Sequence, residues 1–218
     1  MLYLYKKIMI KNVFIAKISD NQDPDNLHRV KVTFTNEKEV VSNWIPVLSP
    51  SAGDKNGIYS LPEIDEQVLV ASLDNDTKNL CILGSIWSDN VKPPETEENS
   101  DADLNSDGNN SLHFIKSRAG NLIILDDTDS KEKIQLISAD KKSRFEFSSE
   151  DELINLETEN DIQIHAEKNL TIEAEEIEIK SSKQMNISAD EFQTKVSKDL
   201  SIESDKDITI KGSGIALN

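Results

Sequence analysis

The sequence predicts an all-β protein in which a compact barrel precedes a repetitive shaft. Three observations lead to this prediction. Alternating apolar and polar residues mark short strands along the chain, an acidic segment divides it, and one short phrase recurs towards its C-terminal end. Side chains of a β-strand alternate between its two faces, so alternating apolar and polar residues indicate a strand. A phrase that recurs at a fixed spacing is typical of stacked short strands.

Residues 1–90 are predicted to form the barrel, or head. Strands are expected at 10–18, 28–34, 40–48, 67–73 and 80–87. Polar turns separate them, and no helical periodicity appears. About five short strands suit a small Greek-key barrel of the oligonucleotide/oligosaccharide-binding (OB) type.

Residues 91–111 differ sharply in composition from the head. Prolines and glutamates lead into a run of Asp, Asn, Ser and Gly with almost nothing to bury. Such a segment cannot offset the entropy lost on ordering, so it is predicted to be a flexible acidic linker. Longer strands follow, expected at 112–117, 121–126, 133–138 and 144–148. Residues 112–150 are therefore interpreted as a β-region that begins the shaft.

Residues 151–218 repeat one phrase: apolar, polar, apolar, polar, small residue, then a polar corner. The first apolar member recurs at steps of 8, 8, 7, 8, 7, 8, 8 and 7 residues. The residues predicted to point inward are Ile154, Leu156, Ile162, Ile164, Leu170, Ile172, Ile177, Ile179, Met185, Ile187, Phe192, Thr194, Val196, Leu200, Ile202, Ile208 and Ile210.

One chain offers too few phrases to bury this stripe alone. Three phrases per turn give under three complete turns, and no 24-residue period marks such turns. In a homotrimer the three stripes meet on a three-fold axis, where burial of each Ile contributes roughly 1.5–3 kcal/mol. An exposed stripe with unpaired edges invites aggregation instead. The sequence therefore predicts an intertwined trimeric β-helix, or prism, with a single-chain solenoid as the alternative.

The last phrase contains Ile215 and Leu217, and no further level follows to cover them. The end of a solenoid normally needs a cap. We therefore expect these two residues to form a docking surface for a small conical partner, with simple fraying as the alternative.

Composition limits the possible functions. The chain has 41 acidic and 24 basic residues and a net charge of -17, so no nucleic-acid partner is expected. A single cysteine, Cys81, excludes an intrachain disulfide. The N-terminal residues do not resemble a secretory signal, and no run of about 18 apolar residues predicts a transmembrane helix. We expect a protein made in the cytoplasm and moved outward by other means.

No catalytic, cofactor or metal site is predicted. His28, His113 and His165 are far apart in sequence and have no zinc- or iron-ligating spacing. Acidic pairs such as Glu175/Glu176 point to opposite faces, whereas acid/base catalysis needs two groups held across one cleft. We therefore expect no enzymatic activity and no cofactor.

Short motifs of the head form a series. They are Arg29–Val32, Trp44–Val47, Ala52-Gly53 with Gly57, Leu61–Val70 and Leu83–Trp87. Together they resemble the barrel of phage baseplate assembly protein V and of the valine-glycine repeat protein G spikes of type VI secretion. Residues 115–121, leading into 125–128, are similar to the segment that opens the spike shaft in the same family.

This resemblance implies the central spike of a contractile injection machine: a phage tail, a tailocin, an extracellular injection particle or a type VI apparatus. Three heads would dock on a trimeric hub protein, and the shaft end would carry a tip protein with proline-alanine-alanine-arginine repeats. The spike would be made in a bacterial cytoplasm and would pierce the target membrane transiently. The histidine pair that holds iron at the tip of resembling phage spikes is absent, so no tip metal is expected.

Two other functions stay open. A barrel of this type with a trimerising stalk would suit capture of single-stranded nucleic acid or a glycan, although aromatic residues make up only 5% of the chain. A phage fibre or adhesin would carry a receptor-binding knob, and the repeat, which continues to Asn218, leaves no residues for one.

Overall fold

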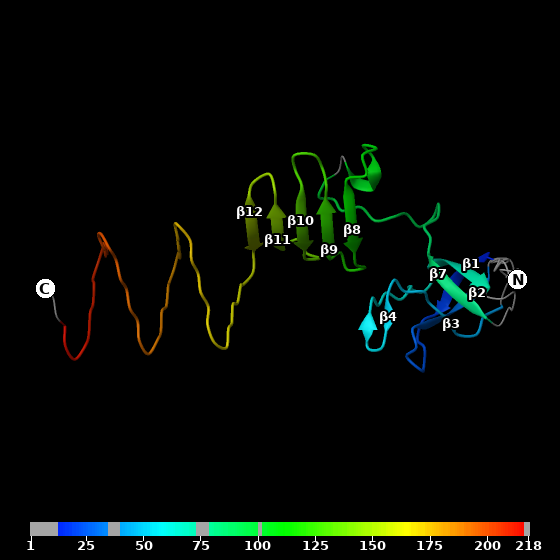
Figure 1. Cartoon of the computed structure of the whole chain (residues 1–218), viewed down its shortest axis with the longest axis horizontal. Helices are drawn as coiled ribbons and strands as arrows, with labels where there is room; N and C mark the ends of the chain where they lie inside the picture. Colours follow the sequence, from blue (N-terminus) through cyan, green and yellow to red (C-terminus); the bar gives the residue numbers. More distant parts are fainter. Residues whose placement is uncertain (1–12, 35–39, 73–78, 100–101, 216–218) are drawn as a thin grey trace, which may run out of the picture. The chain divides into compact units, whose positions relative to one another are not determined.

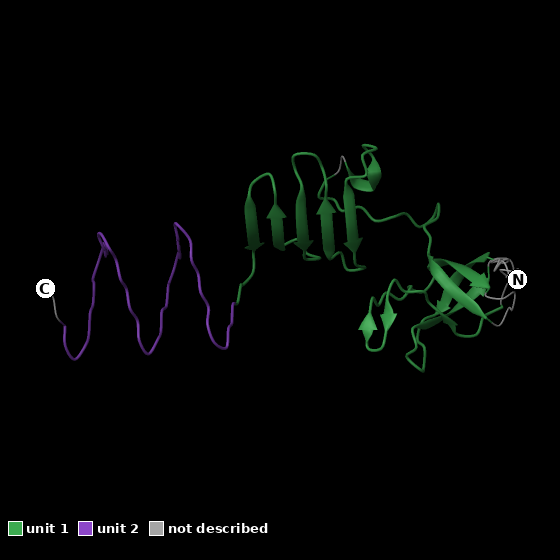
Figure 2. Cartoon of the chain, viewed as in Figure 1, with its two compact units in different colours: residues 1–163 green, residues 164–218 purple. Residues whose placement is uncertain are grey.

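The computed structural model describes residues 13–34, 40–72, 79–99 and 102–215. The chain divides into two compact units, residues 1–163 and residues 164–218 (Figure 2). Among the described residues, all regular structure apart from one short 3-10 helix is β-strand, which confirms the predicted all-β class.

The first sheet forms a barrel. Its strands are β1 (Val13–Asp20), β2 (Arg29–Phe34), β3 (Ile45–Pro46), β6 (Gln67–Ser72) and β7 (Leu80–Ser85), in the order β3-β2-β1-β6-β7. Val47 forms a parallel bridge with Ile82, and the Leu48 N–H donates to the Ile82 carbonyl at 2.8 Å. The chain that follows β3 thus reaches β7 and nearly closes the sheet on itself.

The barrel core consists of alternate residues of these strands, because successive side chains of a strand point to opposite faces. Its buried members are Ala16, Ile18, Val30, Val32, Ile45, Val68, Val70 and Ile82. Each is at most 3% exposed.

One predicted barrel strand is much shorter than expected. Of residues 40–48, only Ile45–Pro46 forms a named strand, and Val41 contributes an isolated bridge to Thr33. Pro46 pairs with Arg29 although it has no N–H to donate, and the Val47 N–H then donates to the His28 carbonyl at 3.1 Å. Residues 10–12 and 73 of the other predicted strands lie outside the described residues.

A short hairpin follows, made of β4 (Ala52–Gly53) and β5 (Asn56–Gly57). Gly57 has φ 149°, and a Cβ there would lie 2.3 Å from the Ser51 carbonyl oxygen. Only glycine allows the two backbones to approach so closely.

The acidic segment 91–111 is partly ordered by a buried carboxylate. It contains η1 (Asp103–Asn105), and Asp103 is 7% exposed. This carboxylate accepts hydrogen bonds from the Thr96 N–H at 2.8 Å, the Thr96 hydroxyl at 2.7 Å and the Glu97 N–H at 2.9 Å. The expectation that this segment buries almost nothing is therefore wrong here, because hydrogen bonds to one carboxylate order a loop that has few apolar residues.

The second sheet is an antiparallel meander (Figure 1). Its strands are β8 (Leu112–Lys116), β9 (Leu122–Asp126), β10 (Lys133–Ile137), β11 (Ser143–Ser148) and β12 (Leu153–Thr158). The first four lie within one residue of the predicted strands. The fifth contains the first phrase of the repeat, which therefore pairs with β11 of its own chain.

Residues 164–215 contain no named strand. Extended runs alternate with bends at 167–168, 175, 182–183, 190–191, 197–198, 205–206 and 213. Figure 1 shows this tail as an open, undulating trace. The bends coincide with the polar corners of the predicted repeat.

Candidate assembly surface

One face of the second sheet presents two rows of side chains that cross all five strands. The cross-strand register places His113, Leu125, Ile134, Phe147 and Ile154 in one row. It places Ile115, Ile123, Leu136, Phe145 and Leu156 in the other. Every member except His113 is apolar, so the face is a continuous hydrophobic surface.

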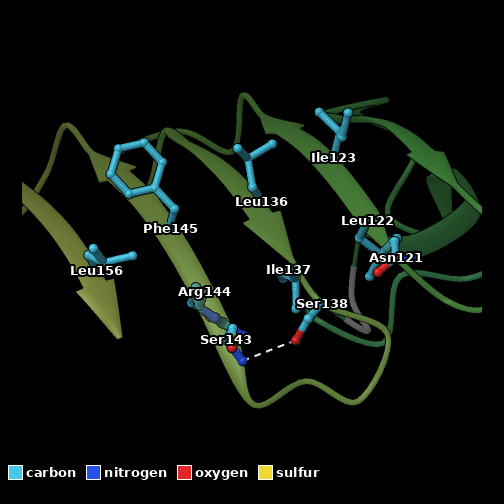
Figure 3. A pocket seen from close by; sticks show the side chains of 10 residues that line it. All are labelled: Asn121, Leu122, Ile123, Leu136, Ile137, Ser138, Ser143, Arg144, Phe145 and Leu156. Carbon is cyan, nitrogen blue, oxygen red and sulfur yellow. Dashed lines mark hydrogen bonds between the residues drawn. The ribbon is translucent and has the colours of Figure 1, made fainter. Parts of the chain in front are cut away.

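These apolar side chains are open to solvent in the single chain. Ile115 is 68% exposed, Ile154 65% and Leu136 46%. Figure 3 shows Ile123, Leu136 and Phe145 standing on the same face, where with Leu156 they line a shallow groove of about 370 Å³. An exposed apolar surface that spans a whole sheet marks an interaction site.

The opposite face of the sheet is occupied by the chain itself. Buried Ala102 packs with Leu112, Leu122, Ile124 and Ile137, which come from β8, β9 and β10. The segment that precedes the sheet therefore covers the apolar side chains that β8, β9 and β10 present on this face, whereas Leu153 of β12 stays 49% exposed.

Ion pairs fasten the same segment to the sheet. Lys141 approaches Glu97 at 3.0 Å and Lys116 approaches it at 3.6 Å, while Arg144 pairs with Glu98. The hydrogen bond from Lys141, together with the charges of Lys141 and Lys116, holds the pKa of Glu97 below its usual range. This leaves the row-bearing face as the uncovered side of the sheet.

The apolar side chains of the tail are exposed to solvent in the same way as those of the sheet. Of its predicted inward residues, Ile164 is 72% exposed, Ile172 69% and Val196 46%, and Thr194 is exposed as well. Ile215 is 56% exposed, and Leu217 lies outside the described residues. A single chain thus leaves the whole described stripe in water.

The tail backbone lacks partners within its own chain. No backbone–backbone hydrogen bond joins any two residues in the described part of 160–215. A single-chain solenoid requires ladders between its successive turns, so the described tail does not form one. Its N–H and C=O groups remain available to strands from elsewhere.

Within the sheet, only Ile154 and Leu156 of the first phrase were predicted to belong to an assembly core. The members of the two rows that lie in β8–β11 were not predicted: His113, Ile115, Ile123, Leu125, Ile134, Leu136, Phe145 and Phe147. Their alternation is visible in the sequence. The register that aligns them across the sheet is not, because the loops between the strands vary in length.

No group of three potential metal ligands comes together among the residues that the structure describes. The His28 ring packs against Tyr59 with centroids 4.8 Å apart, and His165 is exposed in the tail. Burial raises the pKa of the Cys81 thiol, which disfavours a reactive thiolate. The exposed apolar face, not a cleft with reactive groups, is therefore the main candidate site.

Comparison with known families identifies the head. Residues 14–87 match the family described as the type VI secretion system/phage-baseplate injector OB domain. Over this range the head is similar to the members of that family. The match confirms the resemblance seen in the sequence motifs and the OB type of the barrel.

The injector OB domain is a structural baseplate domain, which supports a structural role in a phage baseplate or a type VI apparatus. No curated protein matches the chain. The described residues include no helix of the length and apolarity that crossing a bilayer requires.

Proposed function

We propose that this protein is the homotrimeric central spike of a contractile injection machine. The observation that carries the proposal is the attachment of an injector OB domain to a sheet and a tail whose apolar faces are both uncovered. The two rows of the sheet and the stripe of the tail would meet their copies on a three-fold axis. Isolated chains would expose both surfaces to water.

Burial in a trimer explains the pattern of polarity. Each apolar residue that leaves water contributes roughly 1.5–3 kcal/mol, and the gain recurs in three chains at every level. Arg144 and Glu146 lie on the opposite face of the sheet, where they pair with each other at 3.6 Å. The charged side of the sheet would therefore face solvent while the apolar rows form a dry core.

The tail backbone supports the same arrangement. Its extended runs have no ladder within the chain, so strands from two other copies would supply the missing hydrogen bonds. A shaft in which three chains lace every level is stiff along its axis. Such a shaft transmits the force of a contracting sheath to a target membrane.

The remaining partners follow from the resemblance of the head to known spikes. The three barrels would dock on a trimeric hub protein of the baseplate. The surface around Ile215 would receive a tip protein with proline-alanine-alanine-arginine repeats.

Sedimentation equilibrium of the full chain tests the proposal. We expect one species near three times 24.4 kDa, stable in mild detergent. A monomer at micromolar concentration that keeps its β-content would contradict the trimer. A trimer that binds labelled single-stranded DNA tightly at low salt would favour the nucleic-acid-binding alternative instead.

A further inference from the structure

His113 is the one polar side chain in the two rows of the exposed sheet face. It lies in β8, directly opposite Leu125 of β9, and heads the row that continues through Ile134, Phe147 and Ile154. In a stack whose other members are all apolar, an imidazole needs a partner for its ring nitrogens. None of the described residues of its own chain provides a hydrogen bond to that ring.

We propose that trimer assembly brings three copies of His113 together and that they bind one divalent transition-metal ion, Zn²⁺ being the best match. The inference rests on the proposed trimer. If the apolar rows meet their copies on the three-fold axis, side chains in one row position reach it from all three chains. The His113 side chain is longer than that of Leu125, which lies opposite it, so its imidazole would reach at least as far toward the three-fold axis.

Three neutral imidazoles are an established ligand set for Zn²⁺. They leave a fourth position of the tetrahedron for water or another ligand. β8 is the edge strand of the sheet, so the site would lie at the first level of the stack, beside solvent. Water at the fourth position is compatible with that place.

A carboxylate lies where it would orient the imidazole. The Asp127 N–H donates to the Ser111 carbonyl at 2.9 Å, which extends the β8–β9 ladder by one pair beyond Leu112 and Asp126. Alternation then puts Asp127 on the face of Leu125 and His113, diagonal to the histidine. Diagonal neighbours of a ladder are within reach of long side chains, and a ligating histidine commonly donates its second N–H to a carboxylate.

The single chain does not contain the site. Within the described residues no three His, Cys, Asp or Glu side chains are grouped to hold an ion. His165, which is exposed in the tail, is a control in the same protein. Asp129, also exposed in the loop between β9 and β10, is the matching control for the carboxylate.

Calorimetric titration with Zn²⁺ of tag-free, chelator-treated full-length protein tests the proposal. We expect one Zn²⁺ per three chains and, with Co²⁺ as the probe, the visible absorption of a tetrahedral site. His113→Gln should weaken Zn²⁺ binding at least 100-fold, and His165→Gln should leave it unchanged. Asp127→Asn should weaken it 10- to 100-fold through the lost support of the ligand, whereas Asp129→Asn should not.

Sedimentation of the same samples separates the two proposals. A monomeric wild type would overturn the proposed spike and remove the site with it. A trimer that binds no Zn²⁺ stoichiometrically, or binds it equally well after His113→Gln, would overturn the metal site alone. A trimer of normal stability in which His113 and Asp127 pair across chains without metal would overturn it too.

Discussion

The second sheet and the tail share an alternating apolar pattern but use their backbones differently. In β8–β12 each strand pairs with its sequence neighbour, and one face is covered by the segment around Ala102. The described tail has the same apolar pairs but no backbone ladder within the chain. Alternation in the sequence thus determines which side chains share a face of a strand, whereas the loops between strands determine which strands can pair within the chain.

A charge placed in the tail core should have the largest effect. Ile172→Asp would bring three carboxylates onto the proposed axis, and each buried unpaired charge costs several kcal/mol or is forced to take up a proton. We expect loss of the trimer or a fall in Tm of at least about 10 °C. The barrel, which has its own core, should stay folded by circular dichroism.

Glu173→Ala is the matched control, because it lies one position along and points the other way. Its Tm should stay within about 2 °C of the wild type, in line with a surface substitution. Equal losses in the two variants would show that the inward face of the tail is assigned wrongly.

Shortening an apolar side chain on the exposed face of the sheet should have the second-largest effect on stability. Leu136 is 46% exposed in the single chain, so Leu136→Ala should matter little if the face stays in water. If copies bury it, the substitution should lower the free energy of unfolding by about 2–5 kcal/mol per chain. Chemical denaturation of Leu136→Ala and of the barrel variant Leu27→Ala, whose side chain is 62% exposed, provides the comparison.

The buried carboxylate of the segment before the sheet is the third target. Asp103→Asn keeps the shape but replaces one accepting oxygen by a donor, which faces the Thr96 or Glu97 N–H groups. We expect a loss of about 1–3 kcal/mol and faster hydrogen exchange at Thr96. Asp107→Asn, at an exposed position, should change neither quantity.

Thr194 should give the smallest change in stability. It is the one polar residue among the predicted inward positions of the tail, and we expect its three hydroxyls to bind one another around an ordered water or small ion. Thr194→Val should alter stability by less than about 1 kcal/mol but remove density from the axis in an electron-microscopic map. A map in which Thr194 of the wild type faces solvent would contradict this assignment.

Much of the barrel was predictable from its sequence. The strands at 67–73 and 80–87 were found because their alternation is regular, and the family match covers both. The shortness of β3 was not found, because it depends on which residues of β2 and β3 pair in three dimensions. The bends of the tail were found from spacing alone, since each corner is polar.

Only part of the candidate surface could be predicted from the sequence. Ile154 and Leu156 were placed on an inward face, but their alignment with Phe147 and Phe145 needs the register of the β11–β12 pair. The role of Asp103 was also hidden, since its partners Thr96 and Glu97 become visible only once the loop closes in three dimensions. Both features depend on contacts between segments, which local patterns do not contain.

The unpaired tail backbone has a consequence for how the proposed trimer is made. The barrel and the meander close their ladders within one chain, so in the proposed trimer they could fold as each chain leaves the ribosome, whereas the tail would have to wait for two others. The folding rate of the tail would then depend on chain concentration. Because the phrases of the tail are nearly uniform, three chains could also align with one chain shifted by a whole phrase. The levels of the sheet differ from one another, and β11 carries two phenylalanines, so the sheet would set the correct register between the chains.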